Sequence, residues 1–141
     1  MAIRQLIAAY LSCGATMLAL DAVWLSTMAD RLYRPAIGHL MAERFSLVPA
    51  LLFYVIYVAG MVYFAVIPAL SLGRWQVAAE RGAVLGLLAY ATYDLTNQAT
   101  LTRWPWLVTF ADIAWGTFLT AFAAAVGCLV TLKWGGRLGD T

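Results

Sequence analysis

The stretch GAVLGLLAYATYDLTN (residues 82–97) decides the fold, because it begins as an apolar run and ends in a cluster of polar side chains. On a helix, side chains three and four positions apart share a face. One face of this stretch therefore carries Gly82, Gly86, Tyr90, Asp94 and Asn97. The Gly82-x-x-x-Gly86 spacing lets a neighbouring backbone approach closely, so we expect this face to point into the protein.

The composition of the chain indicates that it lives in a lipid bilayer. Of its 141 residues 64% are hydrophobic and only 11% are charged, whereas soluble domains are about half apolar and a quarter charged. The net charge of +2 comes without a basic block, so a nucleic-acid partner is not expected. At this length we expect one transmembrane domain, residues 1–141.

Four segments are long and apolar enough to cross the membrane as helices, which need about 20 such residues. These predicted spans are residues 4–28, 47–70, 78–101 and 104–132. The fold class is therefore all-α, an integral membrane four-helix bundle. Between the first two spans, RPAIGHLMAERF (residues 34–45) has apolar residues at helical spacing after Pro35, which predicts a short interfacial helix, with an ordinary polar loop as the alternative.

The orientation is indicated by the basic residues that flank the spans. Arg4, Arg74, Arg81, Lys133 and Arg137 would lie on the side of the N-terminus, and Arg31, Arg34, Arg44 and Arg103 on the other. This small excess places both termini in the cytoplasm. Trp75 and Trp134 are expected in the interfacial belt on the side of the termini, with Trp104, Trp106 and Trp24 near the opposite one.

Three aspartates lie inside the spans at a similar depth. Asp21 and Asp94 precede the ends of their helices by about two turns, and Asp112 follows the start of its helix by about two turns. At 1.5 Å per residue, each lies about 10–12 Å below the same membrane face. Charged groups at such depth usually face the protein interior. We therefore expect the three aspartates to line one buried polar chamber.

Several motifs together resemble a bacterial family of small, predicted four-helix membrane proteins of unknown function. They are GAVLGLLAYATYDLTNQATL (82–101), WP (104–105), DIAWG (112–116), DAVWL (21–25), FYVIYVAG (53–60) and IPA (67–69). The resemblance implies the four-span fold and the placement of the polar motif, and we expect the protein in the bacterial inner membrane. The resemblance implies no activity, cofactor or substrate.

The candidate site consists of the polar stripe and the residues at its depth. The expected ligand-binding residues are Asp21, Asp94, Asn97, Asp112 and Tyr90, with Trp24 and Trp115 as walls of the chamber. Carboxylates without a basic partner must be protonated or must bind a cation. Hard divalent cations prefer such oxygen ligands, so Asp21, Asp94 and Asp112 are candidate metal ligands, with His39 as a weaker one. The alternative is a structural hydrogen-bond network between helices.

Three functions agree with these residues. The first is binding or transport of a proton, a cation or a small polar ligand, which for transport would need a dimer or a partner. The second is an intramembrane enzyme that acts on lipid through carboxylate or metal chemistry. The third is a structural or accessory subunit of a larger complex. The helix faces of Gly82 and Gly86, and of Gly116 and Gly127, are candidate homodimer contacts that could equally serve internal packing.

Overall fold

The four long helical stretches expected from the sequence are present in the computed structural model, which describes residues 2–135. In chain order the elements are α1 (Ile3–Met28), the π-helix η1 (Ala29–Tyr33), α2 (Arg34–Ile37), the 3-10 turn η2 (Gly38–Leu40), α3 (Leu47–Met61), the π-helix η3 (Val62–Val66), α4 (Ile67–Leu72), α5 (Trp75–Thr100) and α6 (Trp106–Gly135). The described residues contain no strand. The predicted all-α bundle is confirmed.

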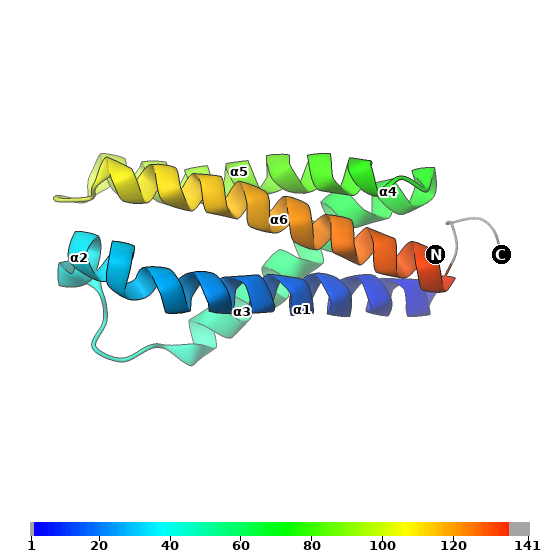
Figure 1. Ribbon diagram of the computed structural model, residues 1–141, viewed down its shortest axis with the longest axis horizontal. Helices are drawn as coiled ribbons and strands as arrows, with labels where there is room; N and C mark the ends of the chain where they lie inside the picture. Colours follow the sequence, from blue (N-terminus) through cyan, green and yellow to red (C-terminus); the bar gives the residue numbers. More distant parts are fainter. Residues whose placement is uncertain (1, 136–141) are drawn as a thin grey trace.

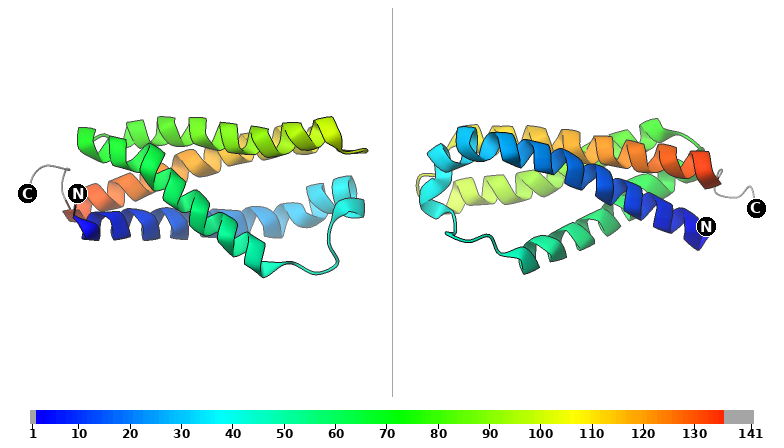
Figure 2. Two further views of the ribbon diagram at one scale, coloured as in Figure 1. Left: turned by 180° about the vertical axis from the view of Figure 1, so that it is seen from behind. Right: turned by 60° about the horizontal axis from the view of Figure 1, so that its bottom comes forward.

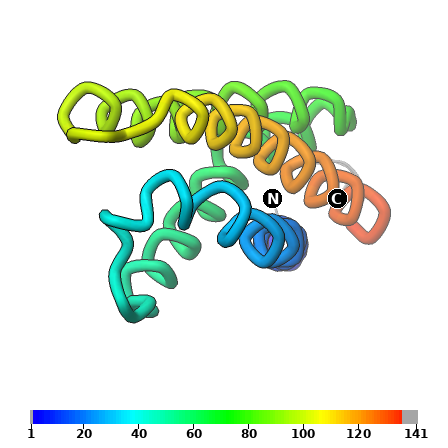
Figure 3. Tube along the Cα trace, turned by 60° about the vertical axis from the view of Figure 1, so that its left-hand side comes forward, coloured from blue at the N-terminus to red at the C-terminus, as the bar shows by residue number. Residues whose placement is uncertain are grey.

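The helices pack around α6. In Figure 1, α5 lies along α6 as an antiparallel hairpin, and α1 runs along the other side of α6 in the opposite direction. Figure 3 shows α1 almost end-on beneath α6. The helix α3 crosses the bundle obliquely, and its beginning stands away from α5 in both views of Figure 2. The helices α1 and α5 therefore flank α6 on different sides.

Three helical stretches are long and apolar enough to cross a membrane: Ile3–Leu40, Leu47–Leu72 and Trp106–Gly135. The fourth helix, α5, has 26 residues and thus the necessary length. It is less apolar because it carries Glu80, Arg81 and the polar run around Asp94. Its crossing of the membrane stays a prediction. Arg137, one of the basic residues in the comparison of the two sides, lies outside the described residues.

The segment between the first two spans is helical but shorter than expected. Pro35 stands in the first turn of α2, as the sequence predicts, and η2 adds one turn up to Leu40. Both elements continue the first helix without a break, through η1. The chain leaves helical geometry after Leu40, so the side chain of Phe45 projects from the following loop and is exposed.

The second span is helical throughout but contains a π-helix next to Pro68. A proline inside a helix cannot donate a backbone hydrogen bond and leaves the carbonyl four residues earlier without its partner. That carbonyl belongs to Phe64, and the guanidinium of Arg81 donates a hydrogen bond to it at 3.5 Å. The helix nevertheless continues to Leu72, because η3 absorbs the irregularity.

Glycines set the contact between α5 and α6. A Cβ atom added to Gly86 would lie 2.2 Å from the backbone oxygen of Gly116, and one added to Gly82 would lie 2.7 Å from that of Thr120. On the side of α1, a Cβ on Gly127 would lie 2.2 Å from the sulfur of Cys13. These faces are therefore occupied inside the chain. The suggestion that they form homodimer contacts is wrong, because the helices of one chain already meet there.

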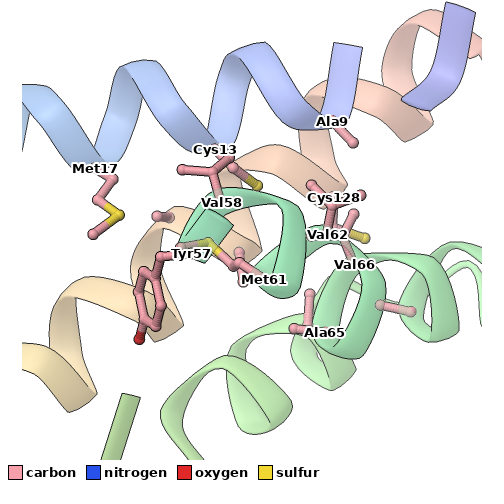
Figure 4. Packing of buried hydrophobic residues seen from close by; sticks show 14 of the residues in the cluster. Ala9, Cys13, Met17, Tyr57, Val58, Met61, Val62, Ala65, Val66 and Cys128 are labelled. Carbon is pink, nitrogen blue, oxygen red and sulfur yellow. The ribbon is translucent and has the colours of Figure 1, made fainter. Parts of the chain in front are cut away.

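The apolar core lies between α1, η3 and α6. Figure 4 shows Met17 and Cys13 of α1 pointing toward Met61 and the neighbouring valines of the second span. Cys13 and Cys128 are both buried, and neither forms a disulfide. Free cysteines in such positions behave as small apolar side chains and fill the core.

The hairpin between α5 and α6 is closed by a ring of side-chain hydrogen bonds. Gln98 donates to the Trp104 carbonyl at 2.7 Å, the Trp104 indole donates to Thr109 at 3.0 Å, and Thr109 donates to Gln98 at 2.9 Å. Trp104 is consequently buried, not part of an exposed belt as the sequence suggested. Arg103 takes a left-handed conformation, with φ of 57°, at the turn.

Candidate functional site

The three intramembrane aspartates are all buried. Asp94 is completely inaccessible, and Asp21 and Asp112 expose only 8% and 7% of their surface. They come from the last third of α1, the last third of α5 and the first third of α6, which lie at the same end of the bundle (Figure 1). Their surroundings differ, however, and the difference decides what each can do.

Asp21 accepts hydrogen bonds on both of its carboxylate oxygens. The Tyr54 hydroxyl of α3 donates to Oδ2, and the Trp115 indole of α6 donates to Oδ1 at 3.0 Å. Both oxygens of this buried side chain therefore have a hydrogen-bond donor. Asp21 thus joins α1, α3 and α6 and has no oxygen directed at the other two aspartates.

Asp112 accepts a hydrogen bond from the Tyr33 hydroxyl. Tyr33 is the last residue of η1, and its hydroxyl oxygen in turn accepts a hydrogen bond from the Trp24 indole at 2.9 Å. Tyr33 was missed by the sequence analysis. No pattern in the sequence marks it, because it lies beyond the first predicted span.

The two D-x-x-W motifs meet through their tryptophans. The indole rings of Trp24 and Trp115 stack with centroids 4.4 Å apart and an interplanar angle of 8°. Each indole serves the carboxylate of the other motif: Trp115 donates directly to Asp21, and Trp24 donates to the tyrosine that is bound to Asp112. The two tryptophans therefore line the site by stacking on each other.

Asp94 is the exception among the three. Within residues 2–135, no N–H or O–H group donates a hydrogen bond to either of its carboxylate oxygens, although both are buried. The group that faces it is the Asp112 carboxyl, near enough for the two to share a hydrogen bond when one is protonated. A buried charge without a donor is strongly unfavourable. Asp94 and Asp112 therefore form a buried pair of carboxyl groups, and among the described residues Asp94 has no other polar partner.

Tyr90 and Asn97 share the stripe of Asp94 but serve other contacts. The Tyr90 ring packs flat over Gly116, where an added Cβ would lie 2.1 Å from the ring. The Asn97 side chain lies beside the Tyr93 hydroxyl one turn earlier and does not bond to Asp94. The expectation that Asp94 and Asn97 contact one ligand stays a prediction.

The predicted metal site is not formed. In the part of the chain that the structure describes, no group of three or more histidine, cysteine, aspartate or glutamate side chains is arranged to hold a metal ion. Asp21 is directed at Tyr54 and Trp115, and His39 is exposed in η2. The set of Asp21, Asp94, Asp112 and His39 is therefore not assembled in this arrangement of side chains, and metal binding by these residues stays a prediction.

The fold and the site define a polytopic α-helical membrane protein with a buried carboxyl pair. Residues 6–129 match the family described as "Predicted membrane protein (DUF2177)", and the chain belongs to this family. No curated protein and no solved structure matches the chain. The resemblance to a membrane protein family of unknown function is thus confirmed.

Proposed function

We propose that this protein binds a proton between Asp94 and Asp112 inside the membrane. The observation that carries the proposal is the fully buried Asp94 carboxyl, whose oxygens receive no hydrogen bond and whose neighbour is another carboxyl. Two neighbouring carboxylates cannot both be ionised without strong repulsion. One proton between them removes a charge and supplies the missing hydrogen bond.

A proton fits this pair better than a metal cation or a small molecule does. A divalent cation takes at least six oxygen ligands, whereas this pair supplies two carboxyl groups with Tyr33 as a donor. A proton requires no added space and no further ligand.

We extend the proposal to transport of that proton across the membrane. Four helices offer little room for a pathway of their own, so transport would require a second copy or a partner protein. We place the protein in a bacterial inner membrane with both termini in the cytoplasm, on the basis of the family resemblance and the small excess of basic residues on that side.

A structural function is the second candidate, and Asp21 favours it. Asp21 connects three helices through Tyr54 and Trp115, and its two oxygens are satisfied. We therefore assign Asp21 and its two donors to the stability of the bundle. Asp94 makes no such bond, so the structural explanation does not extend to it.

We expect the melting temperature of the wild-type protein in detergent to fall as the pH rises. Loss of the shared proton leaves two neighbouring anions in the folded state, and the unfolded state, with separated carboxylates, then becomes relatively more favourable. The Asp94→Asn variant should lose most of this pH dependence, because its amide donates to Asp112 at every pH. Thermal unfolding followed by circular dichroism across pH measures both slopes.

Asp30→Asn is the matched control for this experiment. Asp30 is an exposed aspartate that forms a 2.7 Å ion pair with Arg34, and such pairs contribute little to stability. Its variant should keep the wild-type dependence on pH. A wild-type protein whose melting temperature ignores pH, or an Asp94→Asn variant that retains the full slope, would contradict proton binding at the pair.

A further inference from the structure

The route by which the proton reaches the carboxyl pair is indicated by Tyr33. Resting on the proposed function, we propose that the Tyr33 hydroxyl, held in place by Trp24, is the gate that controls proton exchange between Asp112 and water. Tyr33 closes the side of Asp112 that faces the end of the bundle. Trp24 is a positioning residue, since it acts on Asp112 only through the tyrosine.

The π-helix η1 brings Tyr33 and Trp24 together. In a regular α-helix, residues nine apart lie on opposite faces, because nine residues make two and a half turns of 3.6. The wider turn of η1 reduces this separation, and the Trp24 indole lies 2.9 Å from the Tyr33 hydroxyl. Short π segments inside α-helices are often found at functional sites. Here the π-helix η1 places the Tyr33 hydroxyl next to the buried Asp112 carboxyl.

The hydroxyl of Tyr33 is fixed in one direction by its two partners. A phenolic oxygen can donate one hydrogen bond and accept others. Since Trp24 donates to this oxygen, the tyrosine proton is directed at Asp112. A tryptophan N–H cannot pass its own proton onward at neutral pH, so no proton relay runs through this contact. Trp24 therefore holds the Tyr33 hydroxyl against Asp112 and keeps the gate closed.

Asp112 is the member of the pair through which exchange can occur. Asp94 is completely buried, whereas Asp112 has slight exposure and contacts Tyr33, which is itself half-buried next to exposed residues of α2. The titratable groups nearest the pair from each neighbouring element are Tyr33 of η1, Asp21 of α1, Tyr54 and Tyr57 of α3, and Tyr90 and Tyr93 of α5. The tyrosines are protonated donors, and both oxygens of Asp21 are already bonded to Tyr54 and Trp115, so water is the acceptor in the exchange.

The exchange step follows from this arrangement. When the Tyr33 hydroxyl swings away, a water molecule takes its place at the Asp112 carboxyl. The carboxyl O–H bond breaks, the electron pair stays on the carboxylate, and the water accepts the proton to become hydronium. The reverse step returns a proton from hydronium, and Tyr33 closes again. The rate of proton exchange is then set by how often the Tyr33 hydroxyl moves away from Asp112.

Hydrogen–deuterium exchange of the carboxyl group, followed by infrared spectroscopy, tests the gate. The C=O band of a carboxylic acid moves to lower frequency when its proton is replaced by deuterium, so its shift after transfer to deuterated buffer gives the exchange rate. We expect Tyr33→Phe to exchange about tenfold faster than the wild type, because the hydrogen bond that closes the site is lost. Trp24→Phe keeps the tyrosine and an aromatic ring, and it should also accelerate exchange.

Trp115→Phe is the matched control. Trp24 and Trp115 belong to the same stacked pair and each donates one indole hydrogen bond, but Trp115 donates to Asp21 and does not touch the carboxyl pair. Trp115 thus gives its hydrogen bond neither to Tyr33 nor to the carboxyl pair. The Trp115→Phe variant keeps an aromatic ring against Trp24, so it should lower the melting temperature and leave the exchange rate near that of the wild type. Equal acceleration in Trp24→Phe and Trp115→Phe would overturn the gate, since general loosening would then explain both.

The remaining outcomes separate the gate from the proposed function. A carboxylic acid band in the wild type that disappears in Asp94→Asn supports proton binding by the pair. If that band is present but exchanges at the same rate in wild type, Tyr33→Phe and Trp24→Phe, the gate is wrong while proton binding stands. If the wild type shows no such band, proton binding fails and the gate fails with it. Should Tyr33→Phe not fold, Trp24→Phe decides the question.

Discussion

Gly86→Leu is expected to destabilise the folded protein by about 3 kcal/mol, the upper part of the range for overpacked cores. A Cβ atom at this position would lie 2.2 Å from the Gly116 carbonyl oxygen and 2.8 Å from the Thr120 hydroxyl oxygen. The Gly116 carbonyl oxygen belongs to the backbone, which cannot change its rotamer as a side chain can. The helices α5 and α6 would have to move apart, and that would also separate Asp94 from Asp112.

Gly60→Leu provides the matched control in the same chain. Gly60 lies in the α-helix α3, and an added Cβ would meet no atom within 4 Å. Both substitutions replace glycine by a better helix former, which by itself favours the helix by up to about 1 kcal/mol. Thermal or denaturant unfolding in detergent should therefore show a large loss for Gly86→Leu and little change for Gly60→Leu. Similar stability of the two variants would show that α5 and α6 do not meet at Gly86.

The same substitution at two of the aspartates should have opposite effects on stability. Asp21→Asn is expected to lower the free energy of unfolding by about 1.5–3 kcal/mol, the contribution of a hydrogen bond to a charged group. The new amide has only one acceptor oxygen for the two donors, Tyr54 and Trp115, and its NH2 group would face one of them. Asp94→Asn removes no hydrogen bond from a neighbouring donor, so its stability at neutral pH should equal or exceed that of the wild type.

Unfolding of wild type, Asp21→Asn and Asp94→Asn under one set of conditions measures this difference. Asp21 and Asp94 are both buried, and the substitution is the same at each. Neither exposure nor volume would therefore explain a difference in stability between the two variants. A large loss of stability in Asp94→Asn would show that its carboxylate has a structural partner. An Asp21→Asn variant as stable as the wild type would remove Asp21 from the contacts that hold the helices together.

Much of the architecture follows from local patterns in the sequence. Runs of apolar residues predict the helices, because in a bilayer every backbone polar group must be bonded within its own segment. The three- and four-residue spacing of Gly82, Gly86 and Asp94 predicts which face of α5 points inward, because helix geometry places these positions on one line. The structure buries all three residues against α6. The burial of the aspartates likewise follows from the penalty for charge in lipid.

The partners of the aspartates were decided only by the tertiary structure. Depth along a helix limits how far apart two residues can be, but it leaves open which neighbour each side chain meets. Tyr54 of α3 and Trp115 of α6 bind the two oxygens of Asp21, so the predicted chamber of three carboxylates is divided into one hydrogen-bonded aspartate and one carboxyl pair. Tyr33 reaches Asp112 because a π-helix changes the direction of side chains that follow it, and regular helical periodicity does not predict such a change.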